Sequence, residues 1–279
     1  MSSLATLLLF GAALAQISAF TRGQDGIFSA AEAKLPWISL SDGKTIAHWQ
    51  DPSKLDPPGD AWTIEDGCIK AVPHPRITED LVSDDAYANF ALSFEWRVSP
   101  NGNSGLKYRI QALPILCKAN HLSGTHRFED QVEAALADQS FDRHLIKPGE
   151  SAQIYVVGYE YQTIAGTHPD ALRGPLYQTG ALYSLIPASK NAMRPVDQFN
   201  ESLLIVRGNH IEHWLNGEKV VDGMLDTPKV KEHTAKRWGV SSHTYELLAG
   251  HPAPRGHISI QNHGDAAWFR NLRVKILPD

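Results

Sequence analysis

Apolar and polar residues alternate along several short stretches of the chain, which predicts β-strands. Residues 90–98 and 106–111 each carry a large apolar side chain at every second position, with polar or charged residues between them. The segment Asn101–Gly105 reads Asn-Gly-Asn-Ser-Gly and predicts a tight turn between the two runs. We therefore expect a hairpin with one apolar and one charged face, on which Lys107 and Arg109 lie side by side. The charged face is either a binding groove or a solvated surface of cross-strand ion pairs.

Further alternating runs extend the β pattern to both ends of the chain. Shorter, aromatic-containing stretches at 37–49 and 61–72 are broken by turn residues. A strong hairpin signal comes from the dipeptide Asn216-Gly217, which suits a two-residue type I′ turn between two alternating runs. Strands are predicted at 154–157, 159–162, 180–185, 202–206, 211–215, 218–221, 256–263 and 268–276.

Two regions depart from this pattern. Within residues 112–153, the side chains Phe128, Val132 and Leu136 recur at helical spacing, so this segment is predicted to be a helical insertion. Residues 226–250 look loop-rich or weakly helical. The fold class is therefore all-β: a jelly-roll sandwich of two antiparallel sheets, formed by one domain over residues 35–277 with an insertion at 112–153.

Composition and the N-terminus limit the cellular setting. The net charge of -5 comes without a basic cluster interleaved with aromatic residues, so nucleic acid is not expected as a partner. The apolar run Leu4–Ala15 is too short to cross a bilayer and ends in a small-x-small pattern, which predicts a signal peptide within residues 1–19 and no transmembrane segment. An exported protein, periplasmic or secreted, is expected. Cys68 and Cys117 either form a disulfide or remain two buried thiols.

Blocks of sequence along most of the chain resemble the 3-keto-disaccharide hydrolase family, also described as 3-keto-glycoside 1,2-lyases and hydratases. The blocks keep the family's order and cover roughly residues 35–277; they are 102–109, 159–162, 168–170, 179–183, 194–200, 207–217, 260–264 and 268–271. The resemblance implies a concanavalin-like jelly roll that acts on sugars oxidised at C3. Two features differ from the family pattern: the long insertion, and the segment Thr163–Thr167, which stands where relatives carry an acidic pair.

A ketone at C3 acidifies the hydrogen on C2, so the implied reaction needs a base and a group that stabilises the enolate. Glu160 is the candidate base, unless it only forms a structural ion pair with Arg109 across the sheet. Lys107 is the candidate cation for the developing negative charge, with Arg109 as a second donor. His263 either protonates the leaving oxygen or binds hydroxyls, unless it is a simple surface histidine. The candidate substrate-binding residues are Arg109, Gln162, Asn103, Tyr183, Trp214 and Gln261.

The residues are compatible with more than one cofactor requirement and more than one function. No histidine pair has compact metal-ligand spacing, yet a divalent metal ion held by Glu160 and a histidine is an alternative. No glycine motif for a dinucleotide is present, so a separate sugar 3-dehydrogenase is expected to supply the oxidised sugar. A conventional glycoside hydrolase would use two carboxylates, for which Glu95 and Glu160 are the candidate pair. A non-catalytic carbohydrate-binding module would need only the groove and its aromatic residues.

Overall fold

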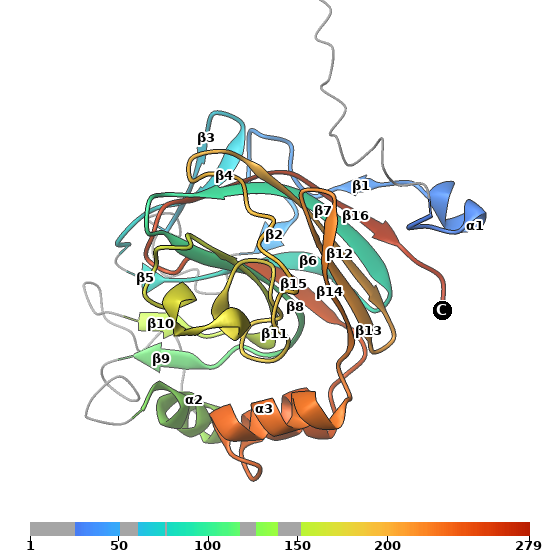
Figure 1. Cartoon of the computed structure of the whole chain (residues 1–279). Helices are drawn as coiled ribbons and strands as arrows, with labels where there is room; N and C mark the ends of the chain where they lie inside the picture. The colour runs from blue at the N-terminus through green and yellow to red at the C-terminus, as the bar shows by residue number, and fades with distance from the viewer. Residues whose placement is uncertain (1–25, 51–60, 76, 118–126, 139–151) are drawn as a thin grey trace, which may run out of the picture.

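The computed structural model describes residues 26–50, 61–75, 77–117, 127–138 and 152–279 of the chain. Two antiparallel sheets face each other across one apolar core, which confirms the predicted jelly-roll sandwich (Figure 1). The larger sheet has the order β14 (Glu218–Met224), β13 (His210–Leu215), β12 (Asn200–Arg207), β7 (Phe90–Val98), β16 (Ala267–Ile276), β4 (Cys68–Ala71) and β3 (Trp62–Glu65), with β1 (Ile38–Ser39) also paired to β16. The smaller sheet has the order β11 (Val157–Ile164), β8 (Asn103–Ala112), β15 (Gly256–Ile260), β6 (Leu81–Tyr87) and β2 (Trp49–Gln50).

The core forms between the inward faces of the two sheets. All five apolar residues at alternate positions of β7 are buried there, as their spacing predicted. The Phe94 ring meets the Tyr161 ring edge-on at a centroid distance of 5.5 Å, which joins the large sheet to the small one. Several polar groups inside the core are paired, which avoids the free-energy cost of burying them alone. The indole N–H of Trp96, for example, donates to Ser202 Oγ at 2.9 Å.

A buried histidine also bridges the two sheets. His213 on β13 has no exposed surface, and its Nδ1 lies 2.9 Å from the carbonyl oxygen of Gly180. A carbonyl only accepts, so Nδ1 carries the proton and Nε2 accepts from the Tyr108 hydroxyl at 3.1 Å. Burial lowers the pKa of His213 to about 4, against a smaller opposing effect of the Gly180 hydrogen bond. The neutral imidazole is thus part of the folded core.

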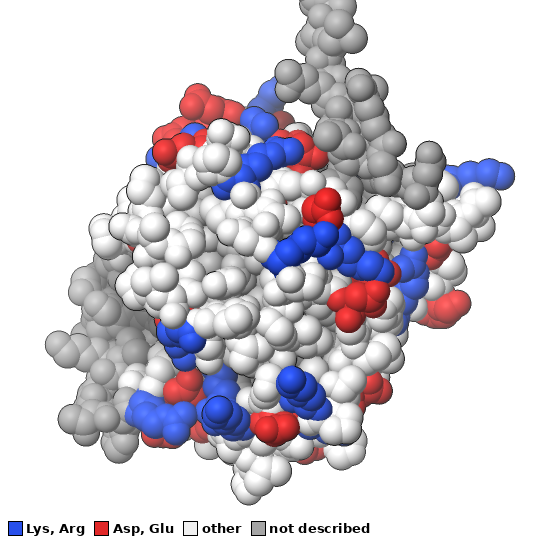
Figure 2. Space-filling model, viewed as in Figure 1, with Lys and Arg blue, Asp and Glu red and all other residues white. Residues whose placement is uncertain are grey.

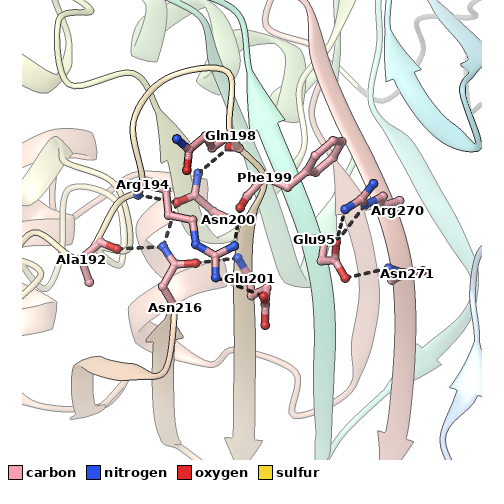
Figure 3. Close-up of polar contacts among 10 residues, drawn as sticks. All are labelled: Glu95, Ala192, Arg194, Gln198, Phe199, Asn200, Glu201, Asn216, Arg270 and Asn271. Atoms are coloured by element: carbon pink, nitrogen blue, oxygen red, sulfur yellow. Dashed lines mark hydrogen bonds and ion pairs between the residues drawn. The ribbon is translucent and has the colours of Figure 1, made fainter. Parts of the chain in front are cut away.

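The predicted hairpin between the first two alternating runs is wrong. β7 pairs with β12 and β16 in the large sheet, whereas β8 pairs with β11 and β15 in the small sheet. The turn before β8 therefore carries the chain from one sheet to the other. As a result, Glu95 lies on the outer face of the large sheet and bonds to Arg270 and Asn271 (Figure 3). The expected ion pairs between the charged faces of these two runs do not form.

The same outer face holds a polar network that fastens the loop before β12 to the β13–β14 turn. The side chain of Asn216 accepts from the backbone N–H of Glu201 at 2.8 Å and donates to the carbonyl of Ala192 at 2.8 Å (Figure 3). Asn216 and Gly217 both have positive φ, at 51° and 88°, as a type I′ turn requires. The hairpin predicted from this dipeptide is confirmed.

The insertion contributes a helix and part of a third, smaller sheet. Helix α2 (Phe128–Ala137) confirms the helical spacing, and β9 (Ile115–Cys117) and β10 (Ala152–Ile154) form a three-stranded sheet with β5 (Ile77–Thr78). Residues 226–250, expected to be loop-rich or weakly helical, follow the helical alternative, with α3 (Pro228–Trp238), α4 (His243–Tyr245) and a π-helical turn, η5 (Glu246–Gly250). Figure 1 shows α2 and α3 together below the small sheet. Glu133 of α2 fastens this helix to α4, because its carboxylate accepts from the backbone N–H groups of His243 and Thr244.

Other predictions have mixed outcomes. Residues 180–185 were expected to form a strand but form turns, in which Leu182 makes isolated bridges to Tyr161 and Ile186. The remaining short helices are α1 (Ala30–Ala33), η3 (Ala171–Arg173) and η4 (Pro175–Tyr177). Cys68 is a buried free thiol, while the side chain of Cys117 and the expected signal peptide lie outside the described residues. Within the described ranges, no helix has the length and apolar character needed to cross a membrane.

Candidate active site

A cavity of about 670 Å³ lies on the face of the small sheet that is turned away from the core. Its floor comes from β8, β11 and the end of β15, and its walls come from α2, α3 and the loop between β11 and β12. Figure 2 shows Lys and Arg side chains alternating with Asp and Glu along the lower edge of the molecule, over α2 and α3. Six of the nine predicted site residues line this cavity: Asn103, Glu160, Gln162, Tyr183, Gln261 and His263.

Strand register explains why the floor residues converge. Glu160 on β11 lies opposite Lys107 on β8, and Gln162 lies opposite Gly105. Lys107 in turn lies opposite Ser259 on β15. Because successive side chains of a strand point to opposite faces, these residues share the outward face, while Tyr159 and Tyr161 point into the core. The strand predicted at residues 159–162 thus forms part of β11, and its two faces alternate as the sequence pattern indicated.

The Glu160 side chain lies across Gly105. A Cβ atom added at Gly105 would be 2.5 Å from Glu160 Oε1, so only glycine leaves room for this carboxylate. None of the described residues donates a hydrogen bond to the carboxylate. Burial raises the pKa of Glu160, and the positive charges of Lys107 and Arg237 only partly oppose this effect. A carboxylate in this position is a stronger base than one exposed to water.

Lys107 is buried beside a second carboxylate that sequence reasoning missed. Its Nζ lies 3.4 Å from Asp80 Oδ2, and the two side chains are 3% and 5% exposed. Asp80 also accepts the backbone N–H of Asn262 at 3.2 Å. Burial opposes the charge on Lys107, but Asp80 and Glu160 outweigh it and raise the pKa of the ammonium. Lys107 is therefore a fixed positive charge beneath the floor rather than one of the residues that line the cavity.

Three buried polar atoms on this face have no hydrogen-bond partner among the described residues. They are Asn103 Oδ1, Ser259 Oγ and Gln261 Oε1. Asn103 is 2% exposed and Gln261 is 8% exposed. Buried polar groups are normally paired, and leaving one unpaired costs about 1–3 kcal/mol. Amide oxygens accept hydrogen bonds, so this part of the floor is suited to a ligand with several hydroxyl groups.

His263 lies at the end of the floor next to a second histidine. The rings of His263 and His168 meet edge-on at a centroid distance of 6.3 Å. The backbone N–H of Asp170 donates to His168 Nδ1 at 3.0 Å, so that nitrogen is unprotonated. Burial lowers the pKa of His263, and the nearby charge of Lys107 lowers it further. His263 is therefore neutral at pH 7, which suits a hydrogen-bonding group better than a strong acid.

Arg109 and Trp214 do not join the other predicted site residues. Arg109 has a positive φ of 50° and lies in a bulge, where residues 109–111 of β8 face Gly158 alone. Its side chain turns away from Lys107 and donates to the carbonyl of Pro254 and to Asn209 Oδ1, each at 3.1 Å. The expectation that Lys107 and Arg109 lie side by side is therefore wrong. Trp214 packs on the outer face of the large sheet, and its indole N–H donates to Glu212 at 2.7 Å.

The cavity walls contain residues that the sequence did not single out. Arg237 of α3 donates to Ser184 Oγ at 3.3 Å and to the Tyr155 hydroxyl at 3.5 Å. Arg173 of η3 donates to Asp170 at 3.2 Å and stacks on Tyr177 at 4.0 Å from the ring centroid. Arg237 lies in the segment expected to be loop-rich or weakly helical, and no element was predicted around Arg173, so no strand periodicity marked either residue. Asp170 alone lay within a block that resembled the family.

Among the described residues, the cavity lining contains no group of three potential metal ligands close enough together to hold an ion. Across the described part of the chain, three ligand atoms approach within 4.8 Å of one another at His210, Glu212 and Asp222. That group lies on the β13–β14 hairpin, outside the cavity lining, and His210 and Asp222 already form an ion pair at 2.7 Å. A divalent ion held by Glu160 and a histidine thus stays a prediction.

Comparisons with known proteins agree on one family. The model of the 3-keto-alpha-glucoside-1,2-lyase-like domain matches residues 36–275. A 3-keto-disaccharide hydrolase from Bacteroides thetaiotaomicron is 31% identical over 258 residues, which is 86% of this chain and 78% of that protein. Two crystal structures described as putative glycosyl hydrolases from Parabacteroides distasonis share the fold. The first has a TM-score of 0.59 at 22% identity and covers 90% of this chain and 98% of that one. The second has a TM-score of 0.53 at 19% identity, with 87% and 100% covered.

Proposed function

Because the chain belongs to the family of 3-keto-alpha-glucoside-1,2-lyase-like domains, we propose that it cleaves the glycosidic bond of sugars whose C3 hydroxyl has been oxidised to a ketone. The observation that carries the proposal is the carboxylate of Glu160. It lies in the cavity floor without a donor among the described residues, and burial raises its pKa. The unpaired acceptors of Asn103 and Gln261 lie on the same floor, where they would receive sugar hydroxyls.

The first step removes the proton from C2. Glu160 takes this proton, and the electron pair of the broken C2–H bond moves toward C3, so that negative charge develops on the ketone oxygen. Lys107 supplies a fixed positive charge beneath the floor, where it stabilises this enolate through a medium of low dielectric constant. Asp80 keeps Lys107 in place and protonated.

The second step breaks the bond between C1 and the leaving oxygen. The enolate electrons return to form a C1–C2 double bond as the C1–O bond breaks, and the leaving oxygen takes up a proton. His263 lies in the same cavity and binds this oxygen or an adjacent hydroxyl as a neutral imidazole. Glu160, which carries the abstracted proton at this stage, gives it to the leaving oxygen and returns to the carboxylate form. Addition of water across the C1–C2 double bond would complete a net hydrolysis.

The conventional glycoside hydrolase alternative loses its candidate carboxylate pair. Glu95 is on the outer face of the large sheet, where it pairs with Arg270 at 2.8 Å, while Glu160 faces the cavity. Two carboxylates that act on one glycosidic bond must flank it within about 10 Å on a shared site. Glu95 therefore cannot act with Glu160. The carbohydrate-binding alternative predicts a different outcome of the experiment below.

The test uses the purified mature chain with a chromogenic glucoside and, separately, its 3-keto derivative. We expect release of the aglycone from the keto derivative alone, and at least a hundredfold loss of kcat in Glu160→Gln. Each assay is repeated with a chelator, so that a metal requirement is measured rather than assumed. Equal release from the plain glucoside would refute the need for a ketone. Binding of the keto sugar without turnover would favour a carbohydrate-binding module.

We also propose that the sugar is oxidised by a separate 3-dehydrogenase before it reaches this protein, and that the protein is exported. Oxidation of a sugar hydroxyl transfers two electrons, and the sequence has no glycine motif for a dinucleotide that would accept them. The apolar N-terminal run with its small-x-small pattern supports export. Fractionation of cells that express the full chain, with the N-terminus of the product sequenced, would test the second point.

A further inference from the structure

The cavity has two chemically different parts. The floor offers unpaired polar atoms on Asn103 and Gln261. Another part of the lining is formed by apolar and aromatic side chains that are each partly exposed; we call this part the aromatic wall, and it consists of Phe128, Tyr155, Leu176, Tyr177 and Tyr183. A ligand in the cavity would therefore meet hydrogen-bond acceptors on the floor and flat apolar surfaces along the wall.

The rings of the aromatic wall are held in fixed orientations. Phe128 and Tyr155 meet edge-on, with centroids 5.1 Å apart and planes inclined by 79°. Tyr177 and Tyr183 form a second edge-on pair at 5.3 Å and 72°. Arg173 lies over Tyr177 at 4.0 Å, which further restrains that ring. Rigid aromatic surfaces bind flat ligands with little loss of conformational entropy.

Two guanidinium groups beside the wall, those of Arg173 and Arg237, already have partners within the protein. Arg173 donates to Asp170 at 3.2 Å and to the Tyr183 hydroxyl at 3.4 Å. Arg237 donates to the Tyr155 hydroxyl at 3.5 Å, and its Nε lies 3.5 Å from Glu129. A second sugar against this wall could place one face on a ring, but its hydroxyls would lose hydrogen bonds to water and find these groups occupied. An aromatic ring has no such requirement.

We propose that the aromatic wall is the aglycone subsite and that it selects 3-keto-glycosides with an aromatic aglycone over 3-keto-disaccharides. This inference rests on the proposed function, because it places the keto sugar on the floor. The wall is built by α2 of the insertion, by Tyr155 between β10 and β11, by η4 and by the turn after it, so segments outside the two main sheets determine which leaving group is accepted.

The test compares three 3-keto-glucosides whose leaving groups are all alcohols, with methyl, 2-phenylethyl and glucosyl aglycones, each supplied as both anomers. Aryl substrates are avoided because a phenolate leaves more easily whatever the enzyme does. For the wild-type chain we expect kcat/KM for the 2-phenylethyl substrate to exceed that for the disaccharide by tenfold or more. In Tyr177→Ala we expect the ratio of kcat/KM between the 2-phenylethyl and methyl substrates to fall about tenfold, as for the loss of one buried aromatic contact.

Control variants distinguish a failure of the aglycone subsite from a failure of the proposed function. Leu172→Ala removes a side chain that is 73% exposed on η3 and does not line the cavity, so it should leave the ratio as in wild type. Phe128→Ala provides a second wall variant should Tyr177→Ala fail to fold. Turnover of the methyl substrate with equal or better use of the disaccharide, or an unchanged ratio in both wall variants, would overturn the aglycone subsite alone. An absence of turnover for all three keto substrates would overturn the proposed function and the subsite with it.

Discussion

Gly105 offers a direct test of whether the position of Glu160 matters for activity. A Cβ atom at this site would be 2.5 Å from Glu160 Oε1 and 3.0 Å from its Cγ and Cδ atoms. Ordinary contacts of this kind are about 3.5 Å, so Gly105→Ala must displace the carboxylate by about 1 Å. Misplacement of a catalytic group by 1 Å can cost about a hundredfold in rate, and we expect a loss of that order in kcat on the keto substrate.

Stability should change far less than activity in this variant. Gly105 does not have a positive φ, so alanine fits its backbone conformation, and the crowded atoms belong to a side chain that can rotate. We expect the free energy of unfolding in urea to stay within about 1 kcal/mol of wild type. Gly166→Ala is the matched control, because its Cβ would meet no atom within 4 Å.

A double-mutant cycle distinguishes displacement of Glu160 from other effects of the new methyl group. If the loss in Gly105→Ala acts through Glu160, the variant Gly105→Ala with Glu160→Gln should be no slower than Glu160→Gln alone. Additive losses would show that the methyl group acts by another route. Full activity of Gly105→Ala would refute the argument that this carboxylate position is needed.

Three further predictions concern stability. His213 has a folded pKa of about 4, against 6.5 for an exposed histidine. Its contribution to the free energy of unfolding is therefore complete above pH 6.5, and about 3 kcal/mol of that free energy is lost as the pH falls toward 4. Urea unfolding measured from pH 7 to pH 4 should show this decline in the wild type, and His213→Phe should lack it. Asp80→Asn leaves the ammonium of Lys107 buried without its partner and should cost about 3 kcal/mol in the same assay, whereas the variant with both Asp80→Asn and Lys107→Met should recover much of this loss. Glu133→Ala removes the carboxylate that accepts the backbone N–H of Thr244, and we expect a loss of about 1–2 kcal/mol and faster hydrogen exchange in α4, which Glu133→Gln should partly prevent.

Local sequence patterns predicted where strands form better than they predicted which strands pair with each other. Alternation identified β7 and β16, and the Asn216-Gly217 dipeptide identified the hairpin, because these signals depend on neighbouring residues alone. The same logic failed at the turn before β8. A short turn between two alternating runs has the same sequence signature whether the second run pairs with the first or crosses to the other sheet. Only the contacts of β8 with β11 and β15, distant in sequence, decide between these outcomes.

A single bulge explains why Arg109 was placed on the wrong side. Strict alternation assigns Lys107 and Arg109 to one face, but the positive φ at Arg109 interrupts the pleat. Ile110 then packs in a separate apolar cluster with Val82 and Val156 rather than in the main core. Bulges leave little trace in the sequence. Alternation therefore assigns side chains to the correct face of a strand only as far as the first bulge.

The paired charges beneath the floor show why the simplest alternative for Glu160 fails. That alternative made Glu160 one half of a structural ion pair on the sheet surface. Instead, Lys107 directly contacts Asp80. Asp80 immediately precedes β6, and the sequence pattern could not assign it to the cavity side of the small sheet. The ammonium of Lys107 thus interacts with two buried carboxylates, those of Asp80 and Glu160, and it directly contacts only Asp80. A carboxylate in this position retains its basicity because its nearest cation is already engaged, while the same cation lies close enough to stabilise negative charge on the substrate.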